Sequence, residues 1–333
     1  MSYKIAIVGA TGEVGKAFLK VLEERNFPVS ELYLFASERS EGKTLSFKGE
    51  SLKVYQLKSP LPLVDVALFS AGADISKEFA PLFVKEGAVV IDNSSAFRLS
   101  PDVPLVVPEV NPEDVKEHMG IIANPNCSTI QMTVALWPIY KRAGIRSIVV
   151  STYQSVSGAG SEAIEELKRQ TKDLFEKGET GQNTVLPRKI AMNVFPQVDS
   201  FDENLYTREE LKMLFETRKI FHDPNIRVSA TCVRVPVLYG HSEAVSIELG
   251  CHLSLQEARE ILSKAPSVVL FDELDYPTPV DVAGKDEVFV GRLRKDMVFE
   301  PGLSMWVVAD NIRKGAATNA IQILELICKL ALV

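Results

Sequence analysis

The sequence is poor in the residues that bind metal ions or form disulfide frameworks. Its 333 residues include only four cysteines and four histidines, and no two cysteines stand in a CxxC pair. Their spacing matches no structural zinc site, so we expect no bound metal. Unpaired thiols are typical of a protein of the reducing cytosol.

Long apolar runs and an excess of positive charge are also lacking. No segment approaches the roughly 18 uninterrupted apolar residues of a membrane span. Even the apolar run 320–333 is broken by Gln322, Glu325 and Lys329. The formal net charge of −7 disfavours a general nucleic-acid binder, which normally carries a basic patch. We therefore expect a cytoplasmic protein with no membrane or nucleic-acid partner, in which local cations would hold any anionic ligand.

The first part of the chain alternates between short apolar segments and amphipathic ones. A chain of this length is expected to form two domains, and strands alternating with helices imply a doubly wound parallel sheet, an α/β fold. The expected strands are 4–8, 32–36, 65–69, 88–91 and 121–123, and the expected helices are 14–24 and 74–86.

The pattern changes after about residue 128, where an α+β domain is expected over 128–310. Its expected strands are longer, and 287–294 with 304–309 could form an antiparallel ribbon. Capping boxes at Thr207/Glu210 and Ser254/Glu257 predict the starts of two helices. The first domain then covers 1–127 and is completed by 311–333, whose helix is expected from about 316.

Three glycines follow the first expected strand with the spacing G-x-x-G-x-x-G. They are Gly9, Gly12 and Gly15. Glycines at this place permit a tight turn and let backbone amides approach a pyrophosphate at the helix N-terminus. Although glycines also make ordinary turns, the position directly after a strand favours a dinucleotide-binding loop.

The residues after the second strand favour NADP as the dinucleotide. NAD-specific folds usually end that strand with an acidic residue that binds the ribose hydroxyls. Here Ser37, Arg39 and Ser40 offer a cation and two hydroxyls for a 2′-phosphate, with Glu38 as a competing charge. The alternative is a solvated loop without a ligand.

Cys127 lies where a helix is expected to begin, directly after a buried strand. A cysteine in the first turn of a helix experiences the helix dipole and free backbone amides, both of which favour the thiolate. Pro125 fixes the chain before it, and Asn126 offers an amide donor for a developing oxyanion. We interpret Cys127 as a nucleophile and the other three cysteines as structural.

His241 and Arg234 are candidates for acid/base and binding roles. His118, His222 and His252 stand in polar contexts, whereas His241 is expected in a turn just after an apolar strand. Arg234 is expected on that strand among valines. A buried arginine must be paired, either with a structural carboxylate or with a substrate carboxylate in its bidentate fork.

At this point the chain resembles a known family, the aspartate-semialdehyde dehydrogenases, from end to end. The resemblance is carried by several segments whose order and spacing are more specific than any one of them. These segments are 9–15, 92–98, 125–129, 154–160, 234–243 and 310–318. The resemblance implies a Rossmann-type NADP-binding domain and a catalytic and dimerisation domain.

The resemblance also implies a role for each matching residue, and none of them departs from the family pattern. Cys127 is similar to the family's nucleophile, His241 to its acid/base, and Gln154 to the residue that orients the substrate, while Asn126 would assist the phosphate-binding pair named next. The implied substrate and phosphate contacts are Arg234 for the α-carboxylate, Glu209 for the amino group, and Arg98 with Lys212 for phosphate. The implied cofactor contacts are Thr11, Gly12, Glu13 and Val14 in the glycine loop, together with Arg39, Ser40, Ser157, Gly158 and Asn311.

The implied reaction is the NADPH-dependent reductive dephosphorylation of 4-phospho-L-aspartate to L-aspartate 4-semialdehyde through a thioester on Cys127. It belongs to the biosynthesis of lysine, threonine, methionine, isoleucine and diaminopimelate. Homodimers are implied as well.

Two alternatives remain open. An N-acetyl-γ-glutamyl-phosphate reductase shares the covalent chemistry, but an acetylated amine would have no use for Glu209. A non-catalytic NADP-binding sensor would leave Cys127 without a role. A cysteine hydrolase fits less well, because it would have no use for the dinucleotide loop.

Overall fold

The computed structural model describes residues 2–333, which form two compact units. Unit 1 contains residues up to Asn126 together with Ala316–Val333, and unit 2 is Cys127–Gly315. The sequence placed the corresponding divisions after residues 127 and 310. Among the described residues, no helix is both long and apolar enough to cross a membrane.

Unit 1 is built on a seven-stranded sheet with the order β3-β4-β2-β1-β5-β6-β7, in which only the β3–β4 pairing is antiparallel. This is the expected doubly wound α/β fold. The strands are β1 (Tyr3–Val8), β2 (Val29–Ala36), β3 (Thr44–Phe47), β4 (Glu50–Gln56), β5 (Val66–Phe69), β6 (Val89–Asp92) and β7 (Ile121–Ala123). The helices are α1 (Glu13–Glu24), α2 (Ala73–Lys85) and α8 (Thr318–Lys329), with 3-10 turns at Glu38–Ser40 and Pro112–Glu117.

Both faces of this sheet are covered by apolar side chains. On one face, α1 and α8 contribute Phe18, Leu22 and Ile321 to a core that includes Ile5 and Leu34. On the other face, α2 packs its aromatic and aliphatic side chains against alternate residues of the same strands. Since the central strands are buried on both sides, they are almost wholly apolar, as parallel strands usually are.

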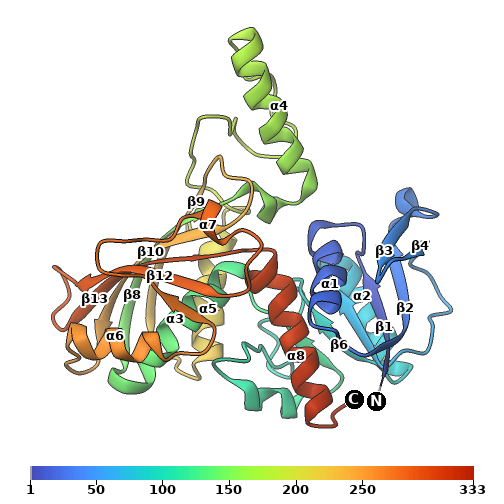
Figure 1. Ribbon diagram of the computed structural model, residues 1–333, viewed down its shortest axis with the longest axis horizontal. Coiled ribbons are helices and arrows are strands. Elements are labelled where there is room, and N and C mark those ends of the chain that lie inside the picture. Colours follow the sequence, from blue (N-terminus) through green and yellow to red (C-terminus); the bar gives the residue numbers. More distant parts are fainter. Residues whose placement is uncertain (1) are drawn as a thin grey trace. The chain divides into compact units, whose positions relative to one another are not determined.

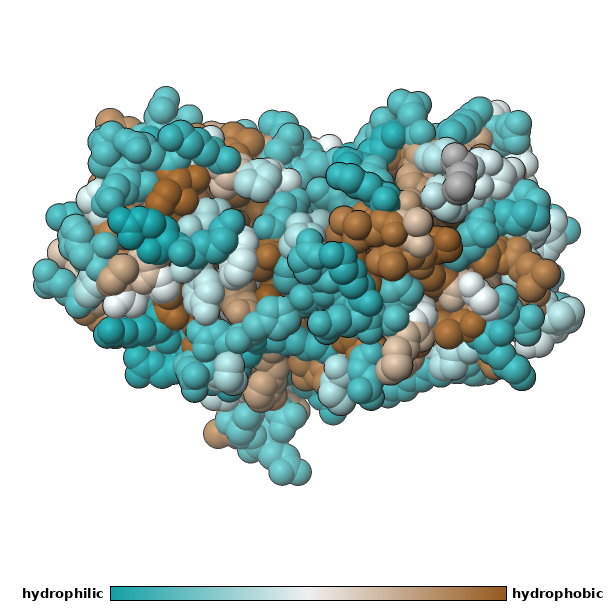
Figure 2. Space-filling view, turned by 90° about the horizontal axis from the view of Figure 1, so that it is seen from below, coloured by the Kyte–Doolittle hydropathy of each residue, from teal (hydrophilic) through white to brown (hydrophobic). Residues whose placement is uncertain are grey.

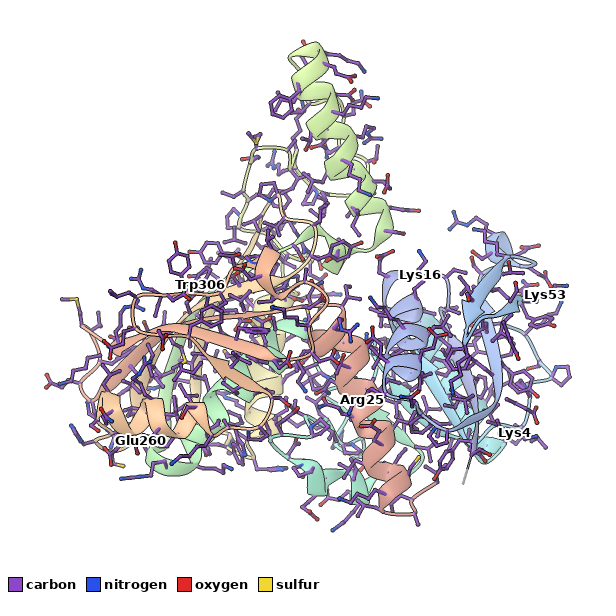
Figure 3. The ribbon with its side chains drawn as sticks, in the orientation of Figure 1. Lys4, Lys16, Arg25, Lys53, Glu260 and Trp306 are labelled. Carbon is purple, nitrogen blue, oxygen red and sulfur yellow. The ribbon has the colours of Figure 1, made fainter. Side chains whose placement is uncertain are left out.

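The C-terminal helix α8 therefore completes unit 1, as the sequence predicted. Arg25, at the end of α1, donates two hydrogen bonds to the carboxylate of Glu325 on α8, at 2.7 and 2.6 Å, and Figure 3 shows it beside that helix. The helix is preceded by a π-helical turn, Arg313–Ala317, so its regular part begins at Thr318.

Unit 2 is built on a six-stranded mixed sheet with the order β11-β12-β13-β10-β8-β9. The strands are β8 (Ile145–Gln154), β9 (Arg227–Arg234), β10 (His241–Leu249), β11 (Val268–Leu270), β12 (Val288–Lys295) and β13 (Gly302–Ala309). The expected antiparallel ribbon is confirmed as β12 paired with β13. The helices are α3 (Cys127–Ala143), α4 (Ser161–Lys177), α5 (Arg208–Ile220), α6 (Leu255–Ser263) and α7 (Pro279–Val282), with a 3-10 turn at Val156–Ala159.

The two faces of this sheet differ. Figure 1 shows α3, α5 and α6 on one face, whereas α4 extends away from the sheet. The opposite face carries Val149 (46% exposed) and Tyr153. The ring of Tyr153 lies 5.4 Å from that of Trp306, which Figure 3 labels on β13.

Figure 2 shows one side of the molecule as mostly hydrophilic, with hydrophobic residues in separate clusters.

Both predicted capping boxes are confirmed, and three details differ from expectation. The sequence analysis missed the β3–β4 hairpin, whose turn places Lys48 and Gly49 at positive φ. The strand that carries Arg234 ends at that residue, because Pro236 cannot donate to a sheet ladder. His241 lies not in a turn but at the start of β10, where it pairs with Ala309.

We expect Gly15→Ala to destabilise unit 1, although alanine is intrinsically the better helix former. A Cβ at Gly15 would lie 2.7 Å from the Cα of Ala10 and closer still to the carbonyl oxygen of Gly9. The overpacking should cost about 1–3 kcal/mol. Thermal or urea unfolding measures the effect, with Lys16→Ala on the exposed side of α1 as the control. Equal stability of the two variants would contradict this account of the glycine spacing.

Candidate functional site

Unit 1 holds a cavity of about 430 Å³ between the glycine loop and the end of β2. Its wall includes Gly9, Thr11, Gly12, Ser37 and Glu38. Gly9 has φ +90°, and a Cβ there would meet the backbone of Ser70 at 2.8 Å. The loop therefore requires glycine, and it leaves backbone amides beside a cavity of the size that ligands occupy.

The residues expected at a 2′-phosphate form the 3-10 turn at the end of β2. Ser37 and Arg39 are exposed, whereas Ser40 is buried. The Ser40 hydroxyl lies 3.4 Å from that of Thr11 and 3.4 Å from Nζ of Lys43. The turn therefore joins the glycine loop, and Lys43 is a second nearby cation that the sequence analysis did not single out.

The other predicted cofactor residues of this loop begin α1. Glu13 is the first residue of the helix and pairs with Lys16 at 3.5 Å, and Val14 packs partly against the core. Gly12, which directly precedes α1, lines the cavity, so the helix begins at the cavity wall.

Arg98 is held in unit 1 by backbone carbonyls. Its Nε donates to the carbonyl oxygen of Asn124 at 2.9 Å, and its Nη2 donates to that of Asn93 at 2.9 Å. Only 8% of Arg98 is exposed. Asn126, also buried, is the last residue of this unit and directly precedes Cys127.

Cys127 is the first residue of α3, as the sequence predicted. It is partly exposed. Burial lowers the pKa of the Arg234 guanidinium, and its interaction with Cys127 acts against this shift. A Cβ on Gly315, in the π-helical turn, would lie 2.8 Å from the Cβ of Cys127. Glycine at 315 therefore lets the turn approach the thiol closely.

The other three cysteines differ from Cys127 in their surroundings. Cys232 is buried and Cys251 is exposed, and Cys328 lies on α8 of unit 1. Burial raises the pKa of the Cys232 thiol far above its usual value. A buried thiol of this kind is inert.

His241 is fully buried, and its ring is fixed through one nitrogen. Nδ1 lies 3.1 Å from the backbone N of Ser155 and 3.1 Å from its hydroxyl. Burial, together with the charge of Arg234, lowers the pKa of His241 to about 3, although Glu209 and the backbone of Gly240 act in the opposite direction. The imidazole is therefore neutral at neutral pH.

The turn after β8 lies against this ring. A Cβ on Gly158 would come within 3.2 Å of both Nε2 of His241 and Nη1 of Arg234. Ser157, in the same turn, lies 3.0 Å from the side-chain nitrogen of Asn311. Three residues predicted as cofactor contacts, Ser157, Gly158 and Asn311, are thus brought to the histidine.

Arg234 is the last residue of β9 and is only 5% exposed. Its Nη1 donates to the carbonyl oxygen of Ser155 at 2.6 Å, and its Nε has no hydrogen-bond partner among the described residues. Burial lowers the pKa of the guanidinium. The negative charge of Glu209 is the largest influence that raises it. A buried guanidinium with an unused N–H can bind a carboxylate.

Four polar and charged side chains form a hydrogen-bonded row: those of Gln154, Glu209, Lys212 and Asp199. Nε2 of Gln154 donates to Oε1 of Glu209 at 3.0 Å, and the other oxygen of Glu209 accepts from Nζ of Lys212 at 3.2 Å. Nζ of Lys212 also donates to Asp199 at 2.8 Å. The capping box of α5 fixes the turn that carries Glu209 and Lys212, so the predicted common face is confirmed.

Ser155 and Glu243 are two residues whose importance the sequence analysis missed. The backbone of Ser155 contacts both Arg234 and His241, and no local pattern reveals a contact made by backbone atoms. Glu243 is fully buried two residues after His241 on β10. Burial raises its pKa well above 4.5, and the amide of Gln131 opposes this only in part.

We expect Glu243→Gln to flatten the dependence of stability on pH. Because the folded-state pKa of Glu243 is raised, the folded protein keeps a proton that the unfolded chain releases. Protonated Glu243 makes its full contribution to the free energy of unfolding below the unfolded pKa of about 4.5. This contribution is lost as the pH rises, by at most about 1.4 kcal/mol per pH unit.

Urea unfolding between pH 5 and pH 8 measures this, with Glu260→Gln as the control. Figure 3 shows Glu260 on α6, where its side chain is exposed. If the free energy of unfolding changed with pH in the same way for the wild type and for Glu243→Gln, Glu243 would be ionised in the folded protein.

Comparison with known proteins agrees with this arrangement over the whole chain. Residues 4–118 match the family model "Semialdehyde dehydrogenase, NAD binding domain", and residues 136–314 match "Semialdehyde dehydrogenase, dimerisation domain". The chain is 64% identical to the aspartate-semialdehyde dehydrogenase of Aquifex aeolicus, with all of both chains covered, and 51% identical to that of Bacillus subtilis, with 99% and 98% covered.

Solved structures give the same result. The crystal structure of aspartate semialdehyde dehydrogenase II from Vibrio cholerae complexed with ASA superposes with a TM-score of 0.97 at 51% identity, with 99% of each chain covered. The enzyme of Candida albicans with NADP superposes with a TM-score of 0.78 at 25% identity over the full length of both chains. The chain belongs to the aspartate-semialdehyde dehydrogenase family.

Proposed function

We propose that this protein catalyses the NADP-dependent interconversion of L-aspartate 4-semialdehyde and 4-phospho-L-aspartate, with phosphate as co-substrate and Cys127 as the nucleophile. The observation that carries the proposal is the composition of the buried site in unit 2. It combines a cysteine at a helix N-terminus, a neutral histidine, and an arginine next to a glutamate. The curated relatives at up to 64% identity support the same substrate.

Binding of an amino-acid substrate follows from the charges of the site. The Arg234 guanidinium would bind the α-carboxylate in a bidentate manner. The Glu209 carboxylate would accept from the ammonium group, and the Gln154 amide, which is already hydrogen-bonded to Glu209 at 3.0 Å, would orient the reacting end. An acetylated amine carries no charge, so a buried carboxylate favours the free amino acid over the N-acetylated one.

Lys212 and Arg98 are the proposed phosphate ligands, and they belong to different units. Lys212 is bound to Asp199 and Glu209, which keep its ammonium group in place beside the Gln154–Glu209 pair. Local cations of this kind can bind phosphate on a protein whose net charge is −7, because diffuse charge is screened beyond about 8–10 Å.

The chemistry would proceed through covalent bonds to Cys127. In the oxidative direction the Cys127 sulfur attacks the aldehyde carbon, and the π-electron pair moves to the oxygen, which is stabilised by Asn126 and takes up a proton. His241, the proposed acid/base, would remove that proton as the hydride leaves. Loss of hydride gives a thioester, and phosphate then displaces the Cys127 sulfur to form the acyl phosphate. A thioester is also the form that accepts hydride readily in the biosynthetic direction.

The cavity of unit 1 fits the cofactor that this reaction needs. Bound NADP would accept or supply the hydride. The amides of Thr11, Gly12, Glu13 and Val14 would hold the pyrophosphate, as at other helix N-termini. The hydroxyls of Ser37 and Ser40 with the Arg39 guanidinium would select the 2′-phosphate, while Ser157, Gly158 and Asn311 would meet the nicotinamide end.

A homodimer and a cytoplasmic location are also proposed. The dimerisation-domain match at residues 136–314 supports the dimer, and so do Val149 and Tyr153, which the sheet of unit 2 leaves partly exposed. The four cysteines are free thiols, which is the state favoured in the cytosol.

The direct test is phosphate-dependent formation of NADPH from L-aspartate 4-semialdehyde. We expect turnover only when semialdehyde, NADP and phosphate are all present. N-acetyl-L-glutamate 5-semialdehyde should be a poor substrate in the same assay. Preference for the acetylated substrate, or activity that does not need phosphate, would contradict the proposal.

We expect Cys127→Ala to lower turnover by about 10⁴-fold or more, since the variant cannot form the thioester. Binding of NADP, measured by calorimetry, should change little. Cys251→Ala, at an exposed cysteine, is the matched control and should keep full activity. Turnover of Cys127→Ala near the wild-type rate would refute the role of Cys127.

Arg234→Lys should raise the KM for the semialdehyde by about 10–100-fold, because a point charge replaces a bidentate fork and one charged hydrogen bond is lost. The KM values for phosphate and NADP should change much less. Equal increases for the semialdehyde and phosphate would contradict a specific role in binding the α-carboxylate.

A further inference from the structure

The side-chain amide of Gln154 lies between two groups that determine its orientation. Its Nε2 lies 3.0 Å from Oε1 of Glu209, and its Oε1 lies 3.1 Å from the hydroxyl oxygen of Thr152. Because the Glu209 carboxylate only accepts hydrogen bonds, the amide nitrogen must face it, and the amide oxygen then faces Thr152. An amide oxygen also only accepts, so the Thr152 hydroxyl is the donor of the second contact.

Thr152 reaches Gln154 because of its position on β8. The two residues stand two positions apart on this strand, so their side chains lie on the same face of the sheet. The residues directly opposite Thr152 are Cys232 on β9 and Glu243 on β10. Thr152, Cys232 and Glu243 are all fully buried, so bulk water does not compete with Gln154 for the hydroxyl.

The fold itself does not require a hydroxyl at residue 152. The preceding residues on this face of β8 are Ile148 and Val150, which are buried and apolar. Valine has nearly the same shape as threonine and suits a strand equally well. Thr152 interrupts this apolar series with a hydroxyl that donates to Gln154, and this specific partner indicates a role in the site.

The nitrogen end of the amide is fixed through Glu209. The second oxygen of Glu209 accepts from Nζ of Lys212 at 3.2 Å, and the capping box of α5 fixes the turn that carries both residues. Gln154 is only 1% exposed and Glu209 only 5%. A hydrogen bond is electrostatically stronger in such surroundings than in water, and leaving one unmade is costly.

We propose that Thr152 is a positioning residue for the reaction, which holds the Gln154 amide with its nitrogen toward Glu209. Without this contact the amide can rotate and present its oxygen to the ammonium group that Glu209 is proposed to bind. The reacting end of the substrate would then lose its alignment. The inference rests on the proposed function, which assigns the ammonium group to Glu209 and the reacting end to Gln154.

Thr152→Val removes the donor and keeps the shape of the side chain. We expect kcat for L-aspartate 4-semialdehyde to fall by about 3–30-fold, the loss of one buried hydrogen bond. The KM for the semialdehyde should change much less, because Arg234 and Glu209 still bind the charged groups. Thr152→Ser restores the donor and should recover most of the lost kcat, whereas equal losses in the two variants would overturn the inference.

Thr133→Val is the matched control in the same unit. Thr133 is also fully buried, but its hydroxyl donates to the backbone carbonyl of Thr129 at 2.7 Å, within α3. We expect this variant to keep the wild-type kcat. A loss as large as that of Thr152→Val would mean that the effect is not specific to the contact with Gln154, and it would overturn the inference.

A double-mutant cycle tests whether Thr152 acts through Gln154. Gln154→Ala removes the partner, so Thr152→Val should lower kcat much less in that background than in the wild type. Loss by the same factor in both backgrounds would contradict the positioning role. If Thr152→Val does not fold, Thr152→Ala, which also lacks the donor, takes its place in the cycle.

Urea unfolding of the same four proteins tests the contact without substrate or cofactor. The shifts in the unfolding midpoint caused by Thr152→Val and Gln154→Ala should be less than additive, because each substitution removes the same hydrogen bond. Additive shifts would overturn the inference. The two proposals fail separately: a wild-type protein without activity on L-aspartate 4-semialdehyde would refute the proposed function, whereas the unfolding cycle still decides whether Thr152 holds Gln154.

Discussion

The backbone of Ser155 is the contact on which the site in unit 2 depends. Its carbonyl oxygen accepts from Arg234 at 2.6 Å, and its N–H donates to His241 at 3.1 Å. Ser155, which directly follows β8, therefore holds both the group proposed to bind the substrate and the group proposed as the acid/base. Since backbone atoms make both of these contacts, the path of the chain at Ser155 helps to determine the geometry, and the Ser155 hydroxyl adds a third contact, to Nδ1 of His241.

Burial of charge is the second constraint, and the site meets it by giving each group a partner. Arg234 and Glu209 are each about 5% exposed, and an isolated buried charge would be strongly destabilising. Glu209 is hydrogen-bonded to Gln154 and Lys212, and Lys212 also to Asp199. Among the described residues, Nε of Arg234 and Nε2 of His241 are the nitrogen atoms of this site without a hydrogen-bond partner.

Local features of the sequence predicted local features of the structure. Cys127 at the start of α3, the glycine loop after β1 and the two capping boxes all depend on residues a few positions apart. The network around His241 joins Ser155 to residues 86 and 156 positions away, so no periodicity could reveal it. The start of β10 at His241 was missed for the same reason, because pairing with Ala309 on a distant strand determines it.

The central claim is the covalent thioester on Cys127, and mass spectrometry of the trapped intermediate tests it most directly. Without NADPH the acylated enzyme has no hydride to accept, so incubation with 4-phospho-L-aspartate should leave one aspartyl group on the peptide that contains Cys127. Added NADPH should remove it and release the semialdehyde. An aspartyl group on Cys232, Cys251 or Cys328, or turnover without any adduct on Cys127 under single-turnover conditions, would contradict the account.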